Sequence, residues 1–552
     1  MSRYCPKFSI TLILTILTWG AFAQQADTTE TPKDWFLRDP ETDHVLGVSA
    51  EKTYSTLLKG KPSTTVLVAV IDSGIDINHE DLKDIIWTNE DEIAGNGIDD
   101  DKNGYVDDVH GWDFIGGKNG NVDHDNLELT REYKRLKAKY ENADETKIGK
   151  KEKEEYAYWK IVKEDFEKSA GDAKRKYDFY QSIYDNISFG NDTLKQILGV
   201  KQLTPELVDG VTSEDKRIQI AKGSVAIIFQ KAGPDANVDE VLQELKGAVD
   251  YFGDQVKYGY NPDFDGRAVV GDNYSNLEET AYGNNDVKGP DATHGTHVAG
   301  IIGANRKNEI GIKGIADNVR IMSVRAVPNG DERDKDVANA IRYAVNNGAK
   351  IINMSFGKAY SPNKEAVDKA VKYAESKGVL LIHAAGNDGK NNDSDKNFPN
   401  RYYLKKGKEA KNWIEVGAAA WGANNEMVAS FSNYGKKSVD LFAPGVEIYS
   451  TTPENTYKNE SGTSMASPAT AGVAALVMSY FPELTSAQVK EILRQSTRKF
   501  DNLKVNKPND KDADEDKEEQ INFSDLSSTG GLVNAYDAVK LAMTYKTKKT
   551  EK

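Results

Sequence analysis

Residues 66–72 read Val-Leu-Val-Ala-Val-Ile-Asp, an unbroken apolar run that ends on a carboxylate. Such a run is typical of a strand buried on both faces, as in a parallel sheet. Similar runs recur at 319–327, 350–354 and 379–384. Helical spacing of apolar residues follows two of these runs, at Val337, Ile341, Ala344 and Val345 and at Val367, Ala370, Val371 and Ala374. The sequence therefore predicts an α/β fold, a parallel sheet with helices on both faces.

Three polar residues stand at or just after the ends of these predicted strands. They are Asp72, Ser355 and Asn387. Ligands of parallel sheets bind beyond the carboxyl ends of the strands. We therefore expect these three residues to lie at a functional edge of the sheet.

Residues 126–265 interrupt the alternation of strands and helices. They are rich in Lys, Glu and Tyr, and apolar and aromatic residues recur there at helical spacing, at Tyr177, Tyr180, Ile183, Tyr184 and Ile187 and at Val241, Leu242, Leu245, Val249 and Phe252. A charged, loosely ordered linker is the alternative, but the periodic aromatics argue against it. We interpret the segment as a mainly α-helical insertion into the α/β domain.

The chain is thus predicted to have several parts. These are a signal peptide at 1–23, an N-terminal extension at 24–60, the first and second parts of the α/β domain at 61–125 and 266–500, the insertion at 126–265, and a tail at 501–552 with an acidic loop at 507–519 and a helix at about 532–545. The 552-residue length is sufficient for a sizeable core.

The N-terminus has the three parts of a signal peptide. Arg3 and Lys7 precede an apolar stretch at 8–19, and Ala21-Phe22-Ala23 forms a small-x-small cleavage pattern. A membrane anchor is the alternative, but the stretch is shorter than the roughly 20 residues that a span needs. We expect export to the periplasm, the cell surface or the medium, and no membrane span in the mature chain.

Charge and cysteine content narrow the range of functions. The net charge of −15 becomes −17 when Arg3 and Lys7 are removed with the signal, and such an acidic chain is not expected to bind nucleic acid. The single cysteine is Cys5, within the signal. The mature chain therefore has no disulfide.

Serine, histidine and aspartate occur in settings that suit nucleophilic catalysis. His294 and His297 lie in T-H-G-T-H-V-A-G, and Ser464 lies in S-G-T-S-M-A-S-P before an apolar helix of about 464–480. A serine hydroxyl is a weak nucleophile and needs a base that is itself oriented by a carboxylate. Asp72, at the end of its predicted strand, can supply that carboxylate. Ala466 replaces the last glycine of a G-x-S-x-G elbow, which argues against an α/β-hydrolase.

These three segments resemble the signature motifs of the subtilases. V-A-V-I-D-S-G-I-D holds Asp72, H-G-T-H-V-A-G holds His294, and G-T-S-M-A-S-P holds Ser464, in the chain order of that family. The resemblance implies that His294, the first histidine of its motif, is the catalytic one. It also implies that Asn387, in A-A-G-N, stabilises the oxyanion. The implied function is an exported serine endopeptidase that acts on polypeptides.

The same resemblance assigns the substrate-binding residues. Two segments match those that bind extended substrate and form the walls of the first specificity pocket, and their members are Ser355, Phe356, Gly357, Ala384, Ala385 and Gly386. The small size of Ala384, Ala385 and Gly386 predicts that the first pocket accepts large apolar side chains. In the family, the loop 328–336 lines the pockets upstream of the cut. Acidic residues there and after the oxyanion asparagine predict a weak preference for basic substrate residues, and these are Asp331, Glu332, Asp334 and Asp388.

The sequence departs from the family pattern in three places. Asp72 and His294 are 222 residues apart because the insertion separates them, and Ala469 stands where the family has histidine after Ser-Pro. Only about 40 residues separate the signal from the α/β domain, about half of what a family-type folding pro-domain needs. We therefore expect no such pro-domain.

Two clusters of oxygen ligands predict structural calcium. In the first, Asp99, Asp101, Asn103 and Gly104 match positions 1, 3, 5 and 6 of an EF-hand loop, and Asp107 or Asp108 would complete the coordination. A solvated acidic turn is the alternative. The second cluster is implied by the family, whose calcium site corresponds to Asp81 and Asn308.

Two other functions remain open at the level of sequence. A relative that has lost activity would bind peptides or act as a scaffold, with the insertion as its interaction module. The same triad could also serve an acyl hydrolase that acts on esters.

Overall fold

The computed structural model describes residues 31–405, 407–509 and 519–550. The predicted signal peptide at 1–23 and most of the acidic loop at 507–519 lie outside the described residues. Within them, the chain forms two compact units, one of 31–128 with 265–550 and one of 129–264. We call them the sheet unit and the helical unit.

Nine strands form the main sheet of the sheet unit, within the described part of the chain. In spatial order they are β12 (Arg498–Lys499), β15 (Gly531–Leu532), β9 (Leu441–Pro444), β8 (Trp413–Ala419), β7 (Leu380–Ala384), β6 (Ile351–Met354), β1 (Val66–Asp72), β5 (Val319–Arg325) and β2 (Gly111–Asp113). All neighbours are parallel except β12 and β15 at one edge. The predicted α/β fold is confirmed. Each of the four apolar runs forms a central strand of this sheet.

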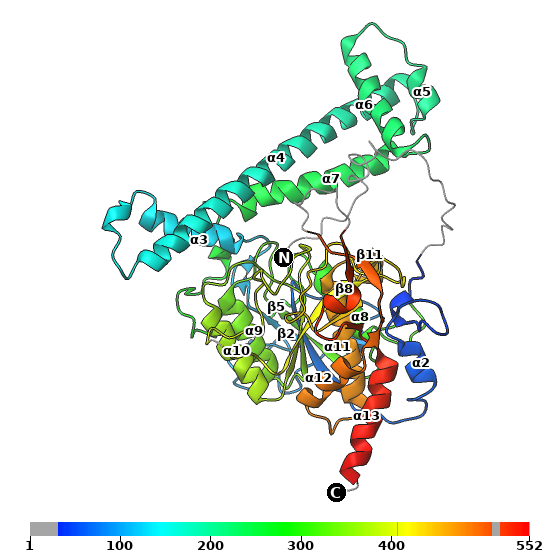
Figure 1. Cartoon of the computed structure of the whole chain (residues 1–552). Helices are drawn as coiled ribbons and strands as arrows, with labels where there is room; N and C mark the ends of the chain where they lie inside the picture. The colour runs from blue at the N-terminus through cyan, green and yellow to red at the C-terminus, as the bar shows by residue number, and fades with distance from the viewer. Residues whose placement is uncertain (1–30, 406, 510–518, 551–552) are drawn as a thin grey trace. The chain divides into compact units, whose positions relative to one another are not determined.

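Helices cover both faces of the sheet (Figure 1). On one face, Ala69 and Ile71 of β1 share a core cluster with apolar residues of α9 (Asp334–Asn346) and α10 (Lys364–Ser376). Successive side chains of a strand point to opposite faces of the sheet, so the alternate residues of β1 point to the other face. On that face α11 (Thr463–Tyr480) packs against β6–β9, and α8 (Thr293–Gly303) packs against β1 and α11. The two helices that hold His294 and Ser464 therefore share one side of the sheet.

The remaining elements of the sheet unit lie around this core. They are η1 (Trp35–Leu37), α2 (Ala50–Ser55), η2 (Lys83–Ile85), η5 (Gly266–Val269), α12 (Ser486–Gln495), η6 (Phe523–Asp525) and α13 (Ala535–Thr550), with the hairpins β3 (Gly116–Gly117)–β4 (Gly120–Asn121), β10 (Ile448–Thr452)–β11 (Thr456–Glu460) and β13 (Lys504–Asn506)–β14 (Gln520–Asn522). The predicted N-terminal extension is not a free arm in its described part. Trp35 and Phe36 are fully buried, and α2 packs against α13.

The C-terminal helix begins later than we predicted. Residues 531–532 form the short strand β15, in which Leu532 pairs with Phe442 of β9, and α13 starts at Ala535. The sequence pattern at 532 is compatible with a helix, but pairing at the sheet edge satisfies the backbone there and buries Leu532.

The helical unit consists of helices joined by short turns. They are α3 (Glu128–Tyr140, whose first residue belongs to the sheet unit), η3 (Glu145–Lys147), α4 (Lys153–Leu198), α5 (Pro205–Asp209), α6 (Lys216–Ala232), α7 (Val238–Asp254) and a π-helical turn η4 (Gln255–Gly259). The 46-residue α4 packs against α6 and α7 around an apolar cluster that includes Leu194, Val225 and Leu245. The periodic residues that we identified from the sequence lie on α4 and α7.

Candidate active site

Asp72 and His294 form a close pair at the carboxyl end of the sheet. Asp72 is the last residue of β1 and is 1% exposed, and its Oδ1 lies 2.7 Å from Nδ1 of His294 on α8. A Cβ on Gly295 would lie 2.2 Å from the carbonyl oxygen of Gly74. Only glycine at this position lets the start of α8 approach the end of β1 so closely.

The pKa of His294 is raised above its ordinary value. Burial disfavours the charged ring, but the Asp72 carboxylate stabilises the imidazolium through charge and a hydrogen bond, and Glu460 adds a second negative charge nearby. His297 differs, because burial lowers its pKa and its Nε2 lies 3.1 Å from the carbonyl oxygen of Lys458. The geometry therefore singles out His294, and not His297, as the histidine that Asp72 orients.

Ser464 lies in the first turn of α11 and is tied to the end of β6. Its Oγ donates to the carbonyl oxygen of Ser355 at 3.1 Å, and the Ser355 hydroxyl donates to the Ser464 carbonyl oxygen at 2.8 Å. Asn353 reinforces the contact, because it donates to Ser355 Oγ and accepts from Ser467 of α11. The Ser464 hydroxyl proton is therefore directed at the Ser355 carbonyl oxygen.

Asn387 lies beside the start of α11. Its Oδ1 accepts from the backbone N–H and from the hydroxyl of Thr463, each at 2.9 Å, and the Thr463 hydroxyl also accepts from the Gly386 N–H at 3.1 Å. The NH₂ group of Asn387 is therefore turned away from Thr463. A Cβ on Gly462 would lie 3.6 Å from that nitrogen and 3.5 Å from the backbone nitrogen of Ser464. The Asn387 amide and the Ser464 backbone N–H therefore border the small space that glycine leaves open at position 462.

Three asparagine amides hold the turn that precedes Asn387. The carbonyl oxygen of Ala385 accepts from Asn392, Asn397 and Asn433 at 2.8, 2.9 and 3.0 Å. Gly386, next in the chain, has φ +104°, a conformation that favours glycine. We call these residues the asparagine cluster. It fixes the backbone from which Asn387 projects.

The predicted substrate-binding segments lie at the ends of β6 and β7. The Phe356 side chain belongs to the core on the α9 and α10 face, and Ala384 and Ala385 are also buried. Only the main chain of these three residues is therefore suited to contact a substrate. A Cβ on Gly357 would lie 2.8 Å from Asn397 Oδ1, and a Cβ on Gly386 would lie 2.5 Å from Asn433 Nδ2.

The predicted acidic rim does not form as expected. Glu332 is 0% and Asp334 2% exposed. Asp334 accepts from Ser361, from the backbone of Asn363 and from Lys358. The start of α9 is packed against neighbouring loops, so the prediction of rim carboxylates at these two positions is wrong. Asp331 is half-buried, and Asp388 is exposed.

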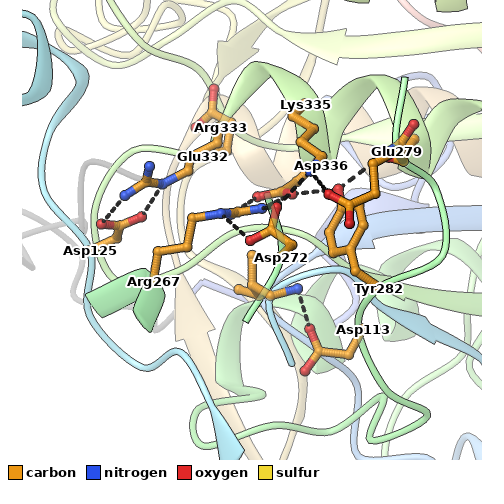
Figure 2. A network of polar contacts seen from close by, with 12 residues as sticks. Asp113, Asp125, Arg267, Asp272, Glu279, Tyr282, Glu332, Arg333, Lys335 and Asp336 are labelled. Atoms are coloured by element: carbon orange, nitrogen blue, oxygen red, sulfur yellow. Dashed lines mark hydrogen bonds and ion pairs between the residues drawn. The ribbon is translucent and has the colours of Figure 1, made fainter. Parts of the chain in front are cut away.

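The basic residues of the same loop also point inward, into a buried ionic network (Figure 2). Arg333 pairs with Asp125, Lys335 with Asp272 and Glu279, and Arg267 with Asp272 and Asp336, and the Tyr282 hydroxyl donates to Asp336. The network joins residues just before the helical unit and residues just after it to the start of α9. It therefore fixes the ends of the interrupted sheet unit on both sides of the insertion.

The first predicted metal cluster is brought together in part. Carboxylate oxygens of Glu92, Asp99 and Asp101 lie within 4.8 Å of one another. Asn103 donates to Asp101 and to Asp108 at 3.0 Å. The sequence reasoning missed Glu92, which precedes the motif by seven residues.

The other two carboxylates of this motif have different surroundings. Asp107 accepts from the backbone of Asn96 and Gly97. Asp108 is fully buried and accepts from Tyr343 at 2.6 Å, and burial raises its pKa to about 6. Neither residue belongs to the group of three carboxylates that lie together. The coordination of a metal ion by Asp107 or Asp108 therefore stays a prediction.

Asp81 and Asn308 are also adjacent, although 227 residues separate them in the chain. Asn308 donates to Asp81 Oδ1 at 2.8 Å, and the backbone of Ile312 donates to Oδ2 at 3.0 Å. Burial raises the pKa of Asp81. A fully buried carboxylate whose charge is disfavoured by its surroundings fits a cation site.

The sequence that forms this sheet, with its Asp–His pair and its serine, matches the profile of a known family. The chain belongs to the subtilase family, whose sequence profile matches residues 63–519. A thermophilic serine proteinase of a Bacillus species is 39% identical over 241 residues, which are 44% of this chain and 54% of that relative. Thermitase of Thermoactinomyces vulgaris is 39% identical over 220 residues, 40% of this chain and 70% of thermitase. The match therefore spans about half the length of the Bacillus relative.

One solved structure aligns with about half of this chain. A protease of Pseudoalteromonas arctica aligns with 49% of this chain and 82% of its own, with 27% identity and a TM-score of 0.37.

Sequence reasoning missed several residues of this site. Thr463 lies in the G-T-S-M-A-S-P motif, directly before Ser464, and this position is the signal that could have identified it. Asn397 lies in a loop rich in asparagine and aspartate that has no periodicity, and Asn433 is far away in the chain. No sequence signal connected these asparagines with Ala385.

Proposed function

We propose that the chain is an exported serine endopeptidase that hydrolyses peptide bonds with Asp72, His294 and Ser464 as its catalytic triad. The observation that carries the proposal is the 2.7 Å contact between Asp72 Oδ1 and His294 Nδ1, at the same sheet edge as a serine in the first turn of α11. Membership of the subtilase family supports it.

The geometry supports a division of roles within the triad. Asp72 holds Nδ1, which leaves Nε2 to take the proton from Ser464 Oγ as that oxygen attacks the substrate carbonyl. The imidazolium that results is stabilised by Asp72 and then gives its proton to the leaving amine. The carbonyl oxygen becomes an oxyanion, and the amide of Asn387 and the backbone N–H of Ser464 are the donors suited to it.

The backbone N–H of Ser464 is available for this role. It lies at the start of α11, where N–H groups have no partner within the helix. The positive end of the helix dipole also favours negative charge there.

Structural calcium is part of the proposal. The carboxylates of Glu92, Asp99 and Asp101 would hold one ion, and Asp81 with Asn308 would hold another. Oxygen ligands of this kind are those that Ca²⁺ prefers. Its role would be to neutralise clustered carboxylates, with no part in the chemistry.

Export rests on the predicted signal peptide. Within the described residues, no helix has the length and apolar character required to cross a bilayer. A peptidase that acts outside the cytoplasm would meet polypeptide substrates there.

The test is hydrolysis of a denatured protein by the full chain. Wild type should cleave it, and Ser464→Ala should retain the fold but lose nearly all activity, because the triad acts as a unit. Ser479→Ala is the matched control, since Ser479 lies on the same helix, far along it from Ser464, and its hydroxyl makes no hydrogen bond within the described residues. Equal activity of wild type and Ser464→Ala would contradict the proposal.

A further inference from the structure

Asn433 lies in the connection between β8 and β9, and it bonds the backbone just before Asn387. Its Nδ2 donates to the Ala385 carbonyl oxygen at 3.0 Å, and its backbone N–H donates to the Gly386 carbonyl oxygen at 2.9 Å. The residue is 2% exposed. The Asn433 carboxamide is therefore buried against the turn that leads into Asn387.

The same side chain bonds the backbone just after Asn387. Asn433 Oδ1 accepts the backbone N–H of Asp388 at 3.0 Å and that of Lys390 at 2.9 Å. These partners fix the orientation of the carboxamide, because a backbone N–H can only donate and a carbonyl oxygen can only accept. Asn433 therefore holds the chain on both sides of the proposed oxyanion donor.

The turn around Asn387 has no regular structure of its own. Residues 385–390 follow the end of β7 and belong to no helix or strand. Gly386 with φ +104° and Gly389 with φ +68° flank Asn387, and glycine leaves the backbone more conformational freedom than other residues do. The position of the Asn387 backbone therefore depends on bonds from other segments of the chain.

We infer that Asn433 is a positioning residue for the proposed peptidase reaction and that it acts through Asn387. The inference rests on the proposed function and deepens it. Thr463 fixes the carboxamide end of Asn387, since its N–H and its hydroxyl both donate to Oδ1, and Asn433 fixes the backbone end. The NH₂ group of Asn387 is thus held in place before the oxyanion forms, which is the condition for efficient electrostatic stabilisation.

The bond to Ala385 is not what distinguishes Asn433 from the other members of the asparagine cluster. The Ala385 carbonyl oxygen has two lone pairs and receives three amide donors, so it stays satisfied when one donor is lost. Asn392→Ala removes one of these donors and leaves Asn433 Oδ1 in place. Asn433→Ala also removes the acceptor of the N–H groups after Asn387. The two variants are therefore a matched pair.

The first measurement is kcat and KM of the full chain on a chromogenic peptide. Asn433→Ala should lower kcat about tenfold and leave KM nearly unchanged, because a displaced donor stabilises the transition state less and contributes little to substrate binding. Asn392→Ala should have a clearly smaller effect on kcat. Asn425→Ala, which changes an exposed asparagine of the same connection, is the control and should behave as wild type.

A double-mutant cycle shows whether Asn433 acts through Asn387. Asn387→Ala should itself lower kcat about 10²–10³-fold, comparable to the loss of one oxyanion donor. In that background Asn433→Ala should change kcat by less than about twofold, because the group that it positions is already absent. A melting curve of each variant shows whether the fold is retained.

The outcomes separate the inference from the proposed function. An equal loss of kcat from Asn433→Ala in both backgrounds would overturn the inference, since a general structural effect does not depend on Asn387. An unchanged kcat of either single variant would overturn it too. In these cases the proposed function stands, provided that wild type cleaves the peptide and Ser464→Ala does not.

If wild type cleaves neither the peptide nor a denatured protein, the proposed function is overturned, and the inference with it. If Asn433→Ala does not fold, Asn433→Ser is measured under the same criteria.

Discussion

The carboxamide oxygen of Asn387 accepts the backbone N–H of Thr463 at 2.9 Å, so the residue beside β7 is bonded to the first turn of α11. Ser464 follows Thr463 directly. The proposed nucleophile and the proposed oxyanion donor are therefore held by one local structure, although they come from segments 77 residues apart. Substitutions at Gly462 and at Thr463 test this arrangement.

Gly462→Ala should block the proposed oxyanion hole and leave the fold intact. Gly462 has φ 167°, an extended conformation that alanine also adopts, and the new Cβ would lie 3.5 and 3.6 Å from the two donors. We expect kcat to fall about 10²-fold, comparable to the loss of one oxyanion donor, with Tm little changed. Gly223→Ala, with open space around its Cβ, is the control. An unchanged kcat would show that this space is not used.

Thr463→Val should lower kcat about tenfold, because it removes the hydroxyl that bonds Asn387 Oδ1 and accepts from Gly386. Thr463→Ser keeps that hydroxyl and should restore most of the activity. Thr463 acts through Asn387, so KM should change much less than kcat. A parallel rise of KM in both variants would indicate a general structural effect instead.

Activity should fall on the acid side of a pKa above about 6.5, the ordinary value for histidine. His294 must be neutral to accept a proton, and the Asp72 and Glu460 carboxylates favour its charged form, so more of it is charged at a given pH. Glu460→Gln should move the acid limb of kcat/KM to lower pH. The check is a pH–rate profile of both proteins, and coincident acid limbs would exclude an influence of Glu460.

Calcium should raise Tm, because the ion binds the folded state and neutralises clustered carboxylates. Melting curves with calcium and with chelator measure the shift. Asp81→Asn and Asp101→Asn should each reduce it, since they change carboxylates of the two separate clusters. Glu426→Gln, an exposed control, should not. A chelator-independent Tm would reject both sites.

Lys358→Met should destabilise the sheet unit by about 3–5 kcal/mol, the usual cost of breaking a buried ion pair. Lys358 is 5% exposed and pairs with Glu128 at 2.8 Å and with Asp334 at 2.9 Å. The variant leaves both carboxylates buried. Denaturant unfolding measures the loss, with exposed Lys437→Met as control, and equal stability of the two variants would show that the ion pairs contribute no net stability.

The sequence by itself determined the fold class and the candidate chemistry. Buried parallel strands require continuous apolar runs such as 66–71, and this local requirement is visible in the residues themselves. Asp72, His294 and Ser464 could also be identified, because their glycine-rich and small-residue settings are local and come in the order of the subtilase motifs.

Only the tertiary structure decided which side chains meet. The bonds of Asn392, Asn397 and Asn433 to Ala385 join segments that lie 7 to 48 residues apart and follow no helical or strand period. The burial of Glu332 and Asp334 also depends on tertiary contacts. A charged loop is expected from its sequence to be solvated, and only the packing of the folded chain buries these two side chains. Periodicity reports which face of an element is apolar, whereas the partner of a polar side chain depends on contacts made after the chain has folded.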